Sequence, residues 1–209
     1  MENLQSLNPN RSKKAASVLK SIIIIFLLPW IYSSTTAFII ESKTIEKTFV
    51  NPFIWGIISF LVFYLFIYEP AKIYQKGQRI TEATFRFLSP LVRVASFVLP
   101  IYSIIFFLIY YLLSFFIKSD LLLQLFIFLI GFSIAFHLVF TAKVLHSRKN
   151  DFLMINYLFS FGFIYLINIA LVTLAFSILF ASFSWLNFCR LSFQISKYIF
   201  SAVFGQLFL

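Results

Sequence analysis

The chain has 209 residues, of which 61% are hydrophobic, 21% aromatic and 11% charged, and its mean hydropathy is +0.96. These values lie well outside the composition of a soluble globular domain, so the sequence predicts an integral membrane protein. The formal net charge of +10 belongs to short connections between apolar segments, which argues against nucleic-acid binding. The single Cys189 excludes an intrachain disulfide, and it cannot form a four-ligand zinc cluster with only two histidines.

Residues 1–20 are polar and contain four Lys or Arg side chains, so they are expected to form a basic tail. Five apolar segments follow, each near or above the roughly 17 to 25 residues that cross a bilayer as a helix. Such runs must be helical, because backbone groups in hydrocarbon find no water to bond and the period-two alternation of barrel strands is missing. The predicted fold is therefore an all-α polytopic membrane domain over residues 21–182, with spans at about 21–40, 52–68, 94–117, 121–142 and 153–182.

Positive charge alternates along the connections between these segments. The tail, residues 69–93 and residues 143–152 are rich in Lys and Arg. In residues 41–51, by contrast, two lysines are offset by two glutamates, and the turn at 118–120 holds only one lysine. Since Lys and Arg accumulate in cytoplasmic loops, the N-terminus is predicted to be cytoplasmic, in a bacterial inner membrane.

The last segment, residues 183–209, is apolar but interrupted by polar side chains at spacings of 3, 4, 3 and 4. At about 100° per residue these side chains fall within an arc of roughly 80°, which predicts an amphipathic helix. This helix either lies in the membrane interface with its polar residues in water, or forms a sixth span that turns them toward a protein partner. We call them the polar stripe: Asn187, Arg190, Gln194, Lys197 and Ser201.

A few polar side chains lie within the predicted spans. His137 and Thr141 are one turn apart on one face of the fourth span, and Tyr165 and Asn168 are one turn apart on the fifth. Asn168 either hydrogen-bonds across to the His137 face or, as is more common for an intramembrane amide, forms an ordinary polar contact between helices. A lone intramembrane histidine can bind a metal, haem or chlorophyll, although it more often bonds a neighbouring helix. No cofactor and no metal site are predicted, and His137 is the candidate ligand if a pigment is bound.

Pro100 lies inside the third predicted span. It frees the carbonyl of Ser96, four residues back, so the sequence predicts a kink there. Common catalytic motifs are missing: the sequence has no HExxH, GxSxG or Walker A pattern, and no pair of intramembrane carboxylates for a proton relay. The sequence therefore predicts a protein that is not an enzyme.

The second predicted span ends on the residues YEPAK, where Glu69 is expected to stay charged at the cytoplasmic interface and to pair with Lys72 or Lys76. An apolar helix with a glutamate at its end, in a small polytopic chain, resembles the site-2-protease-like zinc metallopeptidases of membranes. The resemblance covers the ten residues LFIYEPAKIY. In that family the helix carries HExxH, and a later span supplies an aspartate as the third zinc ligand.

Laid on HExxH, only Glu69 matches, because Tyr68 and Lys72 occupy the two histidine positions. The aspartates of the chain, Asp120 and Asp151, lie in connections. The resemblance therefore implies a peptidase-like protein that has lost its zinc site and no longer cleaves.

These observations predict a non-catalytic scaffold or accessory subunit of a larger membrane assembly, whose partners are the lipid bilayer and other integral membrane proteins. Two alternatives belong to other classes. One is a transporter or a pigment- or haem-binding subunit that uses His137, and the other is an active membrane metalloprotease.

Overall fold

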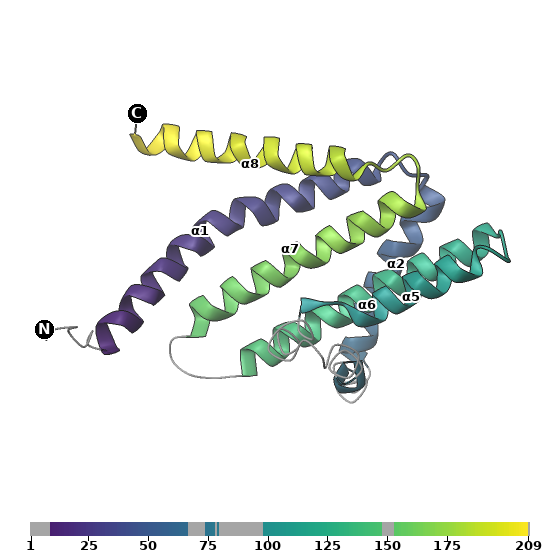
Figure 1. The fold of residues 1–209 in the computed structure, drawn as a ribbon, viewed down its shortest axis with the longest axis horizontal. Coiled ribbons are helices and arrows are strands. Elements are labelled where there is room, and N and C mark those ends of the chain that lie inside the picture. Colours follow the sequence, from purple (N-terminus) through teal and green to yellow (C-terminus); the bar gives the residue numbers. More distant parts are fainter. Residues whose placement is uncertain (1–8, 67–73, 78, 80–97, 148–152, 209) are drawn as a thin grey trace, which may run out of the picture.

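The computed structural model describes residues 9–66, 74–77, 79, 98–147 and 153–208. All regular secondary structure in these ranges is helical, which confirms the all-α prediction for the described residues (Figure 1). The helices are α1 Pro9–Ser42, α2 Lys47–Phe66, α5 Ile101–Leu113, α6 Asp120–Ser147, α7 Leu153–Leu179 and α8 Trp185–Phe208.

Within the described residues, four helical segments are long and apolar enough to cross a membrane, and they correspond to the first, second, fourth and fifth predicted spans. They are Ile23–Ser42, Lys47–Phe66, Asp120–His146 and Tyr157–Leu179. The third prediction, 94–117, overlaps α5, which has only 13 residues. At about 1.5 Å per residue α5 is about 20 Å long, short of the roughly 30 Å of a hydrocarbon core. Residues 94–97 lie outside the described part of the chain, so a count of five spans stays a prediction.

Pro100 is the N-cap of α5, with φ −79° and ψ 77°. A proline fits this place because the first N–H groups of a helix have no partner within the helix. The predicted kink depends on Ser96, which lies outside the described residues, and it stays a prediction. Pro29, in contrast, lies inside α1, which bends along its length in Figure 1. Helix α1 also begins at Pro9, so much of the expected polar tail is helical.

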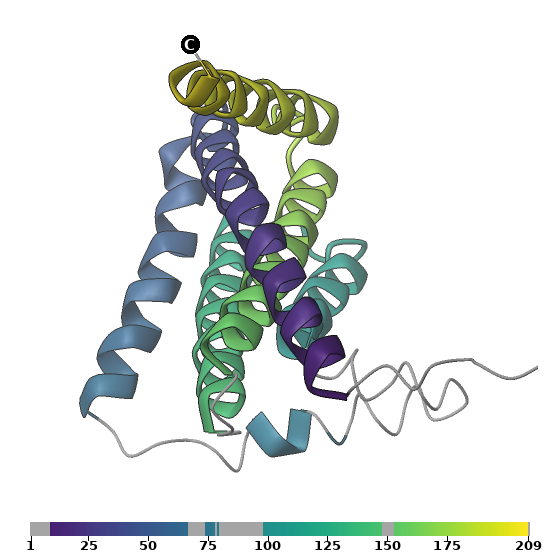
Figure 2. The same cartoon turned by 90° about the vertical axis from the view of Figure 1, so that its left-hand side faces the viewer.

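The helices form two groups. α2 and α5 pack against α6, whereas α7 and α8 pack against α1, and contact between α6 and α7 joins the groups. Although α1 and α2 are consecutive, they diverge from the turn between them, and α6 and α7 are visible between them in Figure 2. The turns α1–α2, α5–α6 and α7–α8 lie at one end of the molecule (Figure 1). These are the connections with little net positive charge, as the alternation of charge predicts; their orientation in a membrane stays a prediction.

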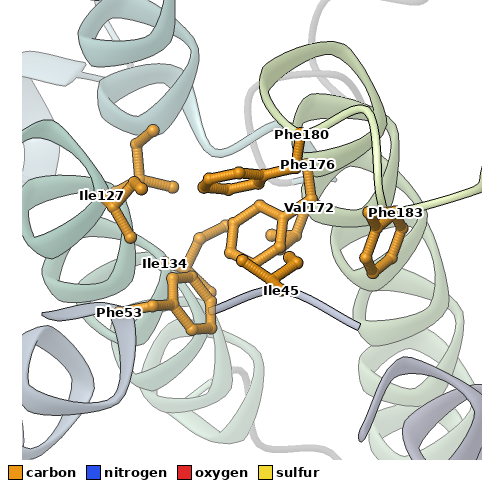
Figure 3. Packing of buried hydrophobic residues seen from close by; sticks show 9 residues of the cluster. Ile45, Phe53, Ile127, Ile134, Val172, Phe176, Phe180 and Phe183 are labelled. Carbon is orange, nitrogen blue, oxygen red and sulfur yellow. The ribbon is translucent and has the colours of Figure 1, made fainter. Parts of the chain in front are cut away.

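A cluster of buried apolar side chains holds this end together (Figure 3). Ile45 in the α1–α2 turn packs with Phe53 of α2 and Phe176 of α7. The rings of Phe53 and Phe176 meet edge to face, with centroids 5.2 Å apart and planes at 75°, an arrangement favoured by the aromatic quadrupole. The other members are Ile127, Ile130, Ile134, Val172, Phe180 and Phe183. The cluster therefore draws on both groups of helices.

Glycines set the distance between α2 and α6. A Cβ added to Gly56 would lie 2.8 Å from the backbone nitrogen of Phe132 and would overlap the carbonyl of Phe128. A Cβ added to Gly131 would overlap the carbonyl of Phe53. The two backbones can approach this closely only because both side chains are missing.

Candidate functional site

The start of α8 is anchored to the end of α1. The backbone N–H of Ser184 donates to Oε1 of Glu41 at 2.9 Å, and the Glu41 side chain is buried. The Thr44 hydroxyl lies 2.7 Å from the carbonyl oxygen of Glu41 and 2.9 Å from that of Ser182. Sequence reasoning treated Glu41 only as a charge in a connection, because a partner 143 positions away leaves no local signal.

From this anchor α8 runs back along α1. Trp30 and Phe193 have ring centroids 6.4 Å apart, and Phe26 and Phe200 have centroids 5.6 Å apart. The face of α8 with the lowest exposure contains Phe188 and two small residues one turn apart, Ser192 and Ser196. On α1, the small residues Ser33 and Ala37 are also buried and are also four positions apart. Small residues at this spacing allow close approach of two helices.

The polar stripe lies on the opposite side of α8. All five of its residues are exposed: Asn187, Arg190, Gln194, Lys197 and Ser201. At about 100° per residue the centre of the stripe lies roughly 180° from the middle of the face formed by Phe188, Ser192 and Ser196. The predicted amphipathic helix therefore packs by its apolar and small residues and leaves its polar residues open. Exposed apolar side chains such as Leu186, Phe193 and Tyr198 flank the stripe.

His137 and Thr141 are both buried on α6, as their spacing predicts. One side chain contacts both of them: the Tyr74 hydroxyl is 2.9 Å from Oγ1 of Thr141, and the Tyr74 ring centroid is 6.2 Å from that of His137. Tyr74 is itself 4% exposed. It comes from the connection after the second span, where nothing in the local pattern indicated a residue that returns to the helix bundle.

The space beside His137 is small. The cavity that it borders with Tyr74, Gly77 and Tyr102 has a volume of about 10 Å³, which is room for about one water molecule. Among the described residues no group of three or more His, Cys, Asp or Glu side chains could hold a metal ion. The geometry around His137 is therefore that of a packed interhelical contact, and its use by a pigment, haem or transported substrate stays a prediction.

Asn168 on α7 does not bond toward the His137 face and instead forms the polar contact between segments that is the more common of its two predicted roles. The Asn168 amide donates to the carbonyl of Val98 at 3.0 Å and to that of Ile164 at 2.8 Å, rather than toward the His137 face. The Tyr165 hydroxyl lies 2.7 Å from Oγ1 of Thr35. Asn168 thus links α7 to the segment before Pro100, and Tyr165 links α7 to α1. Both serve as polar contacts between segments, as intramembrane amides and hydroxyls commonly do.

The remaining predicted positions, Tyr68, Glu69 and Lys72, lie outside the described residues, so their arrangement stays a prediction. Comparisons of the chain with protein-family models, with curated proteins and with solved structures give no match. The resemblance to site-2-protease-like peptidases thus rests on the ten residues LFIYEPAKIY alone.

Proposed function

We propose that the chain is a non-catalytic subunit of a larger membrane assembly, and that the polar stripe of α8 is the surface that binds its partner. The position of α8 beside α1 carries this proposal. Between the contacts Glu41–Ser184 and Phe26–Phe200, α8 rises about 24 Å, most of a hydrocarbon core. If Ile23–Ser42 crosses the membrane, this part of α8 lies at the same depth.

At that depth the polar side chains of the stripe would face hydrocarbon unless a partner binds them. A Lys or Arg side chain at the centre of a membrane helix costs about 2.5 to 3.5 kcal/mol, and the exposed Arg190 and Lys197 both lie on the stripe. A partner helix with carboxylates offsets this cost by charge pairing. Arg190 and Lys197 are separated by about 10 Å along the helix. We therefore expect a partner span with two Asp or Glu residues seven positions apart, and with hydrogen-bonding groups between them for Gln194.

Labelling separates this arrangement from a helix that lies in the interface with its stripe in water. In a Cys189→Ser background, cysteines replace Arg190 or Lys197 one at a time, and an impermeant maleimide is added to native membranes and to detergent extracts. We expect labelling in strong detergent but protection in membranes. A cysteine at the exposed Lys118, in the α5–α6 turn, should label in both. Free modification of positions 190 and 197 in native membranes would contradict the proposal.

Crosslinking tests the chemistry of the partner. A photoactivatable amino acid at Gln194 should crosslink to a peptide from a transmembrane segment that contains two carboxylates. The double substitution Arg190→Gln and Lys197→Gln should abolish this product. Lys76→Gln with Arg79→Gln removes the same charge from two other exposed side chains and should leave it unchanged. A product that survives the stripe substitutions, or one that comes from a segment without carboxylates, contradicts the expected pairing.

A further inference from the structure

A cavity of about 560 Å³ lies between α1, α2, α6 and α7, within the range of small-molecule binding sites. Its inner wall includes the buried Phe53 and Ile134, whereas its rim includes Ile39 of α1 and Ile54 of α2, which are 53% and 47% exposed. The opening therefore lies between α1 and α2, the two helices that diverge in Figure 2. Where these helices cross a membrane, such an opening faces lipid.

One end of the cavity is cationic. Lys43 and Lys47, at the α1–α2 turn, both line it and are both exposed. The two glutamates of the same connection are not among its lining residues. The Glu41 carboxylate accepts the N–H of Ser184, and Glu46 accepts the Thr48 hydroxyl at 3.3 Å. The connection is balanced in sequence, but the fold separates its charges and leaves two ammonium groups at the cavity.

The other end offers hydrogen-bonding groups in a mostly apolar wall. Asn168 lines the cavity and is 1% exposed, and its Oδ1 has no hydrogen-bond partner among the described residues. A buried acceptor of this kind is costly unless something donates to it. The bonded pair Thr35 and Tyr165 also lines this end. From Thr35 to Lys43 the wall of α1 rises about 12 Å.

We propose that this cavity binds a single-chain anionic lipid. The carboxylate or phosphate of the lipid lies at Lys43 and Lys47, its chain follows the isoleucine and phenylalanine wall, and a hydroxyl or a water molecule at the far end donates to Oδ1 of Asn168. The cavity volume lies in the middle of the usual ligand range, which favours one hydrocarbon chain over two. This inference is independent of the α8 partner and remains testable if that partner is not found.

The test uses the purified full-length protein in detergent with three photoactivatable probes of equal chain length: a fatty acid, a lysophosphatidylglycerol and a fatty alcohol. We expect both anionic probes to label peptides of α1 and α2, with the stronger of them indicating whether carboxylate or phosphate is preferred. The neutral alcohol should label roughly fivefold less, and Lys43→Gln with Lys47→Gln should reduce anionic labelling to the same level. Lys118→Gln, at another turn of the same end, should have no effect.

A matched pair of substitutions tests the location. Ile54→Trp places a large ring at the rim and should reduce labelling at least roughly fivefold. Ile58→Trp introduces the same ring one turn further along α2, at an exposed position that does not line the cavity, and should leave labelling unchanged. Because both positions are exposed, neither substitution should disturb the packing of the buried core. Equal labelling of the two variants, or equal labelling by acid and alcohol, overturns the proposal.

Discussion

The carboxylate of Glu41 accepts the backbone N–H of Ser184, the residue immediately before α8, at 2.9 Å. The first N–H groups of a helix have no partner within the helix, and they carry the positive end of its dipole. A buried carboxylate at this point therefore satisfies a donor and stabilises the helix start. The contact joins the α1–α2 turn to the α7–α8 turn, and so determines where α8 begins relative to α1.

Glu41→Gln should loosen the start of α8. The amide oxygen can still accept the Ser184 N–H, but the negative charge is lost, and we expect the docking of α8 to weaken by about 1 kcal/mol. Hydrogen–deuterium exchange of the first turn of α8, in detergent, measures the effect. Glu46→Gln is the matched control, because Glu46 is exposed and lies in the same connection. Unchanged exchange in Glu41→Gln would show that the charge contributes nothing.

The four long apolar helices and the stripe were predictable because they depend on local sequence. Hydropathy over about 20 residues identifies a spanning helix whatever it packs against, and the spacing of Asn187 to Ser201 places the stripe on one face of any regular helix. The same periodicity placed His137 and Thr141 together, and both are buried. What the pattern could not indicate is which distant residue meets that face.

The contacts that were missed all join distant segments. Tyr74 reaches Thr141 across 67 positions, and the close approach of Gly56 to Phe128 depends on how α2 and α6 cross. One pair of glycines, Gly56 and Gly131, is enough to bring these two helices together, and nothing in the local sequence indicated that they face one another. Pro100 is the N-cap of α5, a place that suits proline, and the hydropathy that continues through it did not indicate this helix boundary.

The α2–α6 contact should not tolerate even a methyl group. Gly56→Ala and Gly131→Ala each place a Cβ against the backbone of the facing helix, which cannot move aside as a side chain can. We expect each substitution to lower the free energy of unfolding by about 1 to 3 kcal/mol. Thermal unfolding in detergent, followed by tryptophan fluorescence, measures the change. Gly205→Ala is the control, since nothing lies within 4 Å of an added Cβ there, and a similar loss in that variant would remove the steric explanation.

The Tyr74–Thr141 contact should give a measurable coupling energy in a double-mutant cycle of unfolding free energies. Tyr74→Phe and Thr141→Val each remove one partner of the 2.9 Å hydroxyl contact, so the double variant should be less destabilised than the sum of the two by about 1 kcal/mol. Unfolding in detergent again provides the measurement. Tyr74→Phe combined with Tyr165→Phe should be additive, because Tyr165 bonds Thr35 elsewhere. Additivity of Tyr74→Phe with Thr141→Val would mean that the two hydroxyls do not interact.

The packing of α8 on α1 should depend on small residues. Ser196 is 1% exposed, so Ser196→Leu inserts a branched side chain where there is no room, and we expect α8 to move away from α1. In a Cys189→Ser background, cysteines in place of Trp30 and Phe193 should react with a short bifunctional crosslinker, and Ser196→Leu should reduce the yield severalfold.

Ala202→Leu is the control for this experiment, because Ala202 is exposed and lies on the same helix. It adds similar bulk without entering the contact with α1, so its crosslinking yield should match that of the unsubstituted pair. The decisive measurement is the crosslinking yield of the cysteine pair at positions 30 and 193 without a further substitution. If positions 30 and 193 do not crosslink in native membranes, α8 does not run beside the candidate span of α1, and the polar stripe then has no need of a partner within the membrane.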